Sequence, residues 1–207
     1  MRDIMMGALR ASLVTWVLCG IVYPLALTGL GQWWVPVQAN GSLETNADGA
    51  VIGSRLIGQH WKGPEWFHGR PSATTDTDPN DPAQTVPAPY NAASSGASNL
   101  GPTSKTLAER LSADRKALEE TQPELAGVKL PADMLTTSGS GLDPHISPAN
   151  AALQVARVAQ ARRIQPAAIN ALLERQIIGR SLGIFGEPRV NVLDLNLALQ
   201  RAYQRPD

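Results

Sequence analysis

The amino-terminal part of the chain carries no charged side chain between Arg10 and Glu44, and residues 11–31 read ASLVTWVLCGIVYPLALTGLG. At about 1.5 Å per residue, a helix over this stretch would be roughly 30 Å long, which matches the hydrocarbon core of a bilayer. The apolar core of a cleaved signal peptide is usually shorter, about 7–15 residues. We therefore predict one transmembrane helix over residues 11–31. We expect Pro24 to kink this helix, because proline removes a backbone donor.

Two other interpretations of the same segment fit the sequence less well. The tripeptide Val37-Gln38-Ala39 has the small residues of a signal-peptide cleavage site, but the apolar run ends several residues before it. Cys19 could carry a lipid, but the bulky residues 16–18 precede it where bacterial lipidation prefers small ones. A permanent anchor with an apolar Cys19 is the favoured interpretation.

The charges around the anchor predict its orientation. Arg2 and Arg10 precede the helix, and the next Lys or Arg is Arg55. By the positive-inside rule, residues 1–10 face the cytoplasm and residues 32–207 lie on the other side of the membrane. The chain is therefore expected to cross the membrane once, with a domain outside the cytoplasm over residues 32–207.

Composition limits what this domain can bind. The chain has 18 basic and 18 acidic residues, so no overall positive field attracts nucleic acid, and no nucleic-acid partner is expected. Membrane lipid is the one partner that the anchor itself requires. The single cysteine lies in the anchor, which leaves the domain without a disulfide.

Local patterns predict an α+β domain of short elements. Glycine-bounded apolar runs indicate strands within residues 40–70, and residues 71–104, rich in Pro, Gly and Ser, indicate an exposed loop outside the core. Helices are expected after Ser104, after Ser147 and from Pro166 to about Gly179, followed by a strand over residues 190–193 and a last helix capped by Asp194. On the helix after Ser147, one face contains Leu153, Ala156, Gln160 and Ile164, with Val155, Val158 and Ala159 beside it. The helix from Pro166 is expected to bury Ile169, Leu172, Leu173 and Ile177.

The common catalytic motifs are absent from the sequence. It contains no phosphate-binding loop, no dinucleotide fingerprint, no nucleophile elbow and no paired-histidine zinc motif. His60, His68 and His145 are scattered, so we expect no catalytic residue and no metal site. The glycine-rich run Ser138, Gly139, Ser140 and Gly141 precedes a helix start. Amides in such a run could hold an anion, but a tight turn that packs against the domain is the favoured interpretation.

Several ordered segments resemble the KdpC family, the C subunit of the bacterial Kdp potassium-transporting ATPase. They are Tyr23-Pro24, the runs 38–42, 53–59, 67–73, 98–102, 138–148 and 157–159, and RVNVLDLN at 189–196. The resemblance implies a non-catalytic accessory subunit of an ATP-driven potassium uptake complex. Its location would be a bacterial inner membrane, with the domain over residues 32–207 in the periplasm. Its partners would be a channel-like potassium-binding subunit, an ATP-hydrolysing P-type subunit and a small membrane peptide. The alternative is a single-span structural subunit of another envelope assembly.

The resemblance also implies a role as a catalytic chaperone that raises the ATP affinity of the hydrolysing subunit. The matching positions for nucleotide contact are Ser138, Gly139, Ser140, Gly141 and Gln154. The chain has no cofactor of its own on this view, and ATP would be a shared ligand. The predicted topology conflicts with this role, because ATP is scarce outside the cytoplasm. We therefore expect the domain to shape the outer potassium entrance or to hold the subunits together.

Overall fold

The computed structural model describes residues 1–46 and 48–203 and divides into two units, residues 1–52 and residues 53–207. The amino-terminal unit is dominated by one continuous helical segment, Arg2–Trp34. Within the described residues it is the one helix long and apolar enough to cross a membrane, and none of its side chains is buried. The predicted span, residues 11–31, falls inside this helix, which is longer than predicted at both ends.

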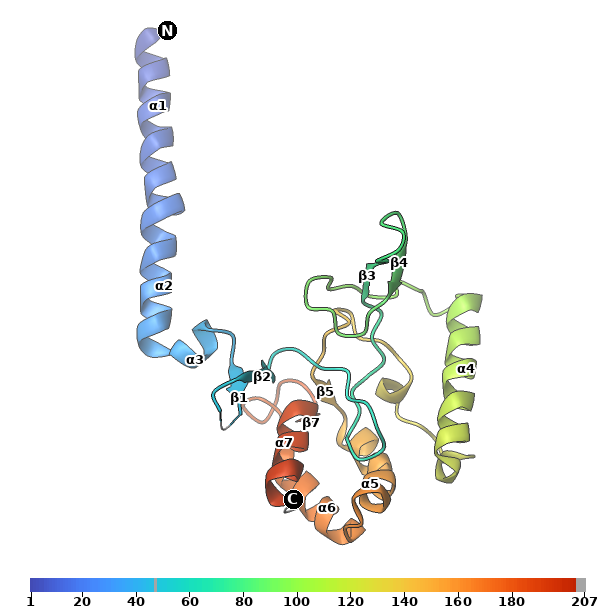
Figure 1. The fold of residues 1–207 in the computed structure, drawn as a ribbon. Coiled ribbons are helices and arrows are strands. Elements are labelled where there is room, and N and C mark those ends of the chain that lie inside the picture. Colours follow the sequence, from blue (N-terminus) through green and yellow to red (C-terminus); the bar gives the residue numbers. More distant parts are fainter. Residues whose placement is uncertain (47, 204–207) are drawn as a thin grey trace. The chain divides into compact units, whose positions relative to one another are not determined.

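The long helix changes its winding just before Pro24. It consists of α1 (Arg2–Val17), the π-helical segment η1 (Leu18–Val22) and α2 (Tyr23–Trp34), as Figure 1 shows for α1 and α2. Pro24 has no N–H for the carbonyl four residues earlier, and its ring crowds that carbonyl. A widened turn at this position relieves the crowding. The short helix α3 (Pro36–Ala39) follows.

The strands of the structure are short. β1 (Leu43–Thr45) pairs with β2 (Val51–Ser54), in the region where strands were predicted. β3 (Thr75–Thr77) and β4 (Thr85–Pro87) form an antiparallel hairpin. A third sheet has the order β5-β7-β6, with β5 (His145–Ile146), β6 (Ile177–Ile178) and β7 (Arg189–Asn191), all antiparallel.

The β3–β4 hairpin corrects the prediction that residues 71–104 are loop alone. Thr74, just before β3, is buried, and its hydroxyl donates to the Ala88 carbonyl at 2.6 Å. Pro87 is the last residue of β4, a short edge strand, and proline is tolerated at such a position. The prediction of a loop is confirmed for residues 91–104, which contain no helix or strand.

Helices α5 (Pro148–Arg162), α6 (Pro166–Gln176) and α7 (Val192–Ala202) surround the core together with β7 (Figure 1). α4 (Lys105–Thr121) has no buried side chain, and two 3-10 turns follow it, η2 (Pro123–Leu125) and η3 (Ala132–Met134). The caps predicted at Ser104 and Ser147 are confirmed, because both hydroxyls accept a backbone N–H of the first turn. The core consists of Phe67, Ile146, Ala151, Val155, Val158, Ala159, Ile169, Leu173, Val190, Val192, Leu195 and Leu199.

Two details of the helices differ from the predictions. On α5 the buried apolar residues are Ala151, Val155, Val158 and Ala159, whereas Ala156 and Gln160 are exposed. The buried stripe includes Asn150 and Gln154, two polar residues that find partners inside the domain, so hydrophobicity alone favoured the wrong face.

The predicted cap of α7 also lies too far along the sequence. Asn191, not Asp194, caps this helix, since its side-chain oxygen accepts the N–H groups of Leu193 and Asp194. The helix therefore starts at Val192, within the predicted strand, and Asp194 instead forms an ion pair with Arg55 at 3.0 Å.

Candidate functional site

The glycine-rich loop over residues 138–148 is bonded to several segments of the domain. The Ser140 carbonyl accepts the Gly96 N–H at 2.9 Å, and the Gly141 carbonyl accepts the Ser72 hydroxyl at 2.7 Å. The Leu142 carbonyl accepts the Gly58 N–H at 2.8 Å. The loop thus connects three stretches of the chain that have little regular structure of their own.

Gly141 is the glycine in this loop whose conformation is demanding. Its φ is +69°, and a Cβ there would lie 2.6 Å from the Gly96 carbonyl oxygen and 2.6 Å from the methyl group of the buried Thr74. Only glycine adopts this angle and this close approach without strain. Gly139 differs, because a Cβ there would have no neighbour within 4 Å.

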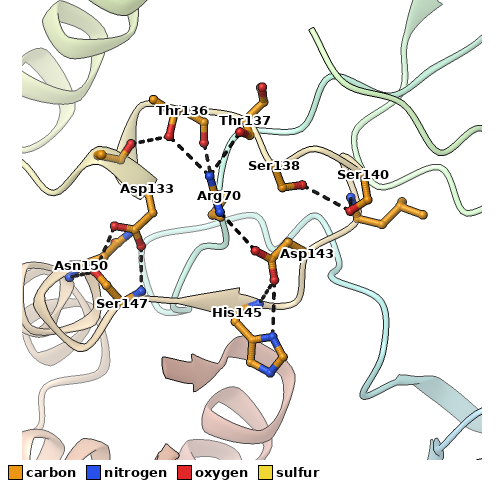
Figure 2. A network of polar contacts seen from close by, with 12 residues as sticks. Arg70, Asp133, Thr136, Thr137, Ser138, Ser140, Asp143, His145, Ser147 and Asn150 are labelled. Atoms are coloured by element: carbon orange, nitrogen blue, oxygen red, sulfur yellow. Dashed lines mark hydrogen bonds and ion pairs between the residues drawn. The ribbon is translucent and has the colours of Figure 1, made fainter. Parts of the chain in front are cut away.

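The helix start that follows the loop already holds a negative group from the chain itself. One Asp133 carboxylate oxygen accepts the Ser147 N–H at 2.7 Å and the Asn150 side-chain amide at 3.0 Å, and the other accepts the Ser147 hydroxyl at 2.9 Å. Figure 2 shows this carboxylate beside Ser147 and Asn150. An anionic group here complements the positive end of α5. Asp133 therefore occupies the place where a bound anion was considered.

Arg70 joins the loop to the segment before it. Its guanidinium donates to Asp143 at 3.2 Å and to the Thr137 carbonyl at 3.2 Å (Figure 2). Asp143 in turn accepts the backbone N–H of His145 at 3.0 Å, so its side chain braces the turn around Pro144. Burial alone would raise the pKa of Asp143, but the hydrogen bonds from His145 and the charge of Arg70 outweigh it and lower that pKa below its ordinary value.

Gln154 lies in α5 with its amide fully engaged. Its oxygen accepts the His68 N–H at 2.8 Å and an Arg157 N–H at 2.7 Å. Its nitrogen donates to the His68 carbonyl at 3.1 Å and to the Asn150 side-chain oxygen at 2.8 Å. The side chain is buried, so these contacts account for both donors and both acceptor positions of the amide.

The side-chain amide of Asn196 makes the same kind of contact with Phe67, the residue before His68. Asn196 of α7 accepts the Phe67 N–H and donates to the Phe67 carbonyl, both at 2.9 Å. Residues 67 and 68 thus pair with two side-chain amides in the way a strand pairs with a neighbour. Arg157 extends the attachment by donating to the carbonyls of Pro64 at 2.7 Å and Trp66 at 2.9 Å.

The five positions predicted for nucleotide contact come from two parts of the fold. Ser138, Gly139, Ser140 and Gly141 lie in the loop after η3, and Gln154 is buried in α5. A cavity of about 500 Å³ lies elsewhere, between α4 and residues 59–72, and none of the five lines it. Among residues 1–46 and 48–203, no group of three or more His, Cys, Asp or Glu side chains could hold a metal ion.

Asp133, Arg157 and Asn196 have structural roles that were not predicted from the sequence. One signal was available for α5: Asn150, Gln154 and Arg157 follow one another at helical spacing on a face that is otherwise apolar. A polar stripe within a buried face requires internal partners, because unpaired polar groups are costly to bury. Nothing in the sequence indicated which backbone segment those partners would come from.

An apolar helix of membrane-spanning length joined to a small α+β domain defines this chain as a membrane-anchored protein. Residues 5–201 match the family model described as KdpC, the c chain of the K⁺-transporting ATPase. The chain belongs to the KdpC family.

Three similar proteins are each described as a potassium-transporting ATPase KdpC subunit. The one from Methylobacterium nodulans is 55% identical over 199 residues, covering 94% of this chain and 97% of the relative. The one from Bradyrhizobium diazoefficiens is 56% identical over 190 residues, covering 92% of each chain. The one from Rhodopseudomonas palustris CGA009 is 54% identical over 204 residues, covering 99% and 98%. These matches confirm the resemblance to the KdpC family that was predicted from the sequence. They favour a subunit of a potassium-transporting ATPase over a structural subunit of another envelope assembly.

Proposed function

We propose that this chain is a non-catalytic accessory subunit that holds the Kdp potassium-transporting complex together from outside the cytoplasm. Its partners in this proposal are the channel-like potassium-binding subunit, the ATP-hydrolysing P-type subunit and the small membrane peptide. The apolar helix anchors the chain in the bacterial inner membrane. Arg2 and Arg10 before that helix, with no Lys or Arg after it until Arg55, support a periplasmic domain.

The observation that carries the proposal is the internal use of the polar groups at the candidate site. Gln154 has a partner for each hydrogen-bonding position, and Asp133 occupies the start of α5. A nucleotide phosphate placed at that helix start would have to displace a carboxylate. The arrangement supports a rigid scaffold that presents outer surfaces to other subunits, rather than a cleft that opens for ATP.

The family's chaperone role makes a different prediction about Gln154, so ATPase measurements separate the two accounts. The experiment measures ATP hydrolysis against ATP concentration for purified complexes that carry Gln154→Ala or, as a control on the exposed face of the same helix, Gln160→Ala. Our proposal predicts half-saturating ATP within about twofold of the unmodified complex for both variants. A tenfold rise for Gln154→Ala alone, equal to roughly 1.4 kcal/mol of lost binding, in fully assembled complex would favour the chaperone role.

A complex prepared without this chain tests the assembly role itself. The proposal predicts that the remaining subunits no longer purify together as a stable, potassium-transporting particle. Full assembly and transport in the absence of this chain would contradict the proposed function.

A further inference from the structure

One short segment contains most of the exposed large apolar side chains in the described part of residues 53–207. Among the described residues from 53 onward, the exposed large apolar side chains are Leu56 and five that lie within residues 177–185. Leu182, Ile184 and Phe185 are 88%, 71% and 64% exposed, and Ile177 and Ile178 lie beside them in the chain on β6. We call residues 177–187 the apolar hairpin. Exposed apolar groups gathered in this way mark interaction sites.

The apolar hairpin is closed by specific contacts and is not a loose loop. Ser181 and Phe185 exchange two backbone hydrogen bonds, each 2.9 Å long. At the base, one Arg180 nitrogen contacts both carboxylate oxygens of Glu187, at 2.8 and 2.7 Å. These two charges cancel, so the tip is both apolar and locally neutral.

The tip also holds a residue in an unfavourable backbone conformation. Leu182 has φ +54° and Gly183 has φ +75°, so a leucine occupies the left-handed region that glycine and asparagine tolerate better. Strain of this kind is concentrated at functional sites, where a fixed shape is useful. In the isolated domain, this leucine combines backbone strain with an almost fully exposed side chain.

We propose that the apolar hairpin is a docking element that inserts Leu182, Ile184 and Phe185 into an apolar cleft on another membrane subunit of the potassium-transporting complex. This proposal rests on the accessory role proposed above. A protein cleft rewards a preorganised shape, because rigid groups lose less freedom on binding. A lipid surface is fluid and requires no fixed shape, and the paired charges of Arg180 and Glu187 give no net attraction to anionic headgroups.

The first test removes the apolar side chains and leaves the backbone contacts. The triple variant Leu182→Ser, Ile184→Ser, Phe185→Ser is compared with Leu56→Ser, which alters an exposed leucine elsewhere on the domain. Both chains are expressed with the other subunits, and the complex is isolated through a tag on the ATP-hydrolysing subunit. We expect at least a tenfold loss of the triple variant from the complex and no loss of Leu56→Ser. Equal retention of the two variants would overturn the proposal.

The second test separates docking from folding. Leu182→Asn places a residue that tolerates positive φ at the strained position and removes the apolar side chain. We expect the thermal midpoint of the full chain in detergent to stay the same or rise by a few degrees, while retention in the complex falls. Unchanged retention would contradict the docking role, and a fall in both quantities would show a structural role instead.

The third test identifies what lies against the tip. A photo-crosslinking amino acid at position 182 in the intact membrane complex should form a product with one of the other subunits. A product with lipid alone, or none while the chain remains in the complex, would overturn the docking assignment and leave the accessory function standing. Failure of the accessory function would appear differently, as a complex that assembles without this chain.

Discussion

Substitution of Gly141 by alanine tests whether the glycine-rich loop acts as a structural joint. The added Cβ would meet the Gly96 carbonyl oxygen and the Thr74 methyl group, both at 2.6 Å. Thr74 is buried and bonded to the Ala88 carbonyl, so it has little freedom to move. Left-handed backbone costs about 1–2 kcal/mol for a residue with a Cβ, and overpacking adds about 1–3 kcal/mol. We expect Gly141→Ala to lower the free energy of unfolding by about 2–5 kcal/mol.

The assay is thermal unfolding of the full chain in mild detergent, followed by tryptophan fluorescence. For a domain of this size, 1 kcal/mol corresponds to roughly 2–4 °C in the midpoint, so the expected fall is about 4–20 °C. Gly139→Ala is the matched control, because a Cβ there meets nothing within 4 Å. A midpoint for Gly141→Ala within about 2 °C of the Gly139→Ala midpoint would refute the reasoning.

Three further predictions concern other parts of the chain. Gln154→Ala leaves half-buried backbone groups of His68 without partners and should lower the free energy of unfolding by about 2–3 kcal/mol in urea titrations. Gln160→Ala should change it by under about 0.5 kcal/mol. Burial, aided by the charge of Arg157, lowers the pKa of His68 in the folded chain. The contribution of His68 to the free energy of unfolding should therefore be complete above about pH 6.5 and fall as the pH decreases, by at most about 1.4 kcal/mol per pH unit. His68→Gln should flatten this pH dependence, and an equally steep curve for the variant would contradict the prediction. Gly20→Leu enlarges a small residue on the exposed helix and should reduce co-purification with the membrane subunits; unchanged recovery would leave the helix as a tether alone.

Local signals in the sequence predicted the elements that depend on neighbouring residues. The apolar helix, the caps at Ser104 and Ser147 and the α+β class follow from hydrophobic length and capping chemistry. The α7 cap was wrong by three residues. Asn191 and Asp194 are both good capping residues, and β7 runs directly into the helix without a turn to separate them.

The candidate site depended on contacts between distant parts of the chain, which the sequence does not display. The partners of Gln154 lie at His68, far away in the chain, and its own helix supplies only Asn150 and Arg157. The anion at the start of α5 comes from Asp133, within a segment that has no motif. The prediction that Ile177 is buried on the helix from Pro166 is wrong, because α6 ends at Gln176 and Ile177 lies exposed on β6. Apolar residues of an exposed hairpin resemble core residues in the sequence until their exposure is known.

The central claim is that the domain works outside the cytoplasm, and residue-specific labelling tests it most directly. In a Cys19→Ser background, Lys105→Cys on the exposed face of α4 and Ile4→Cys at the start of α1 are treated in intact spheroplasts with a membrane-impermeant maleimide. The account predicts that Lys105→Cys is labelled without lysis and that Ile4→Cys is labelled only after lysis. Labelling of Ile4→Cys in intact spheroplasts, with Lys105→Cys protected until lysis, would contradict it.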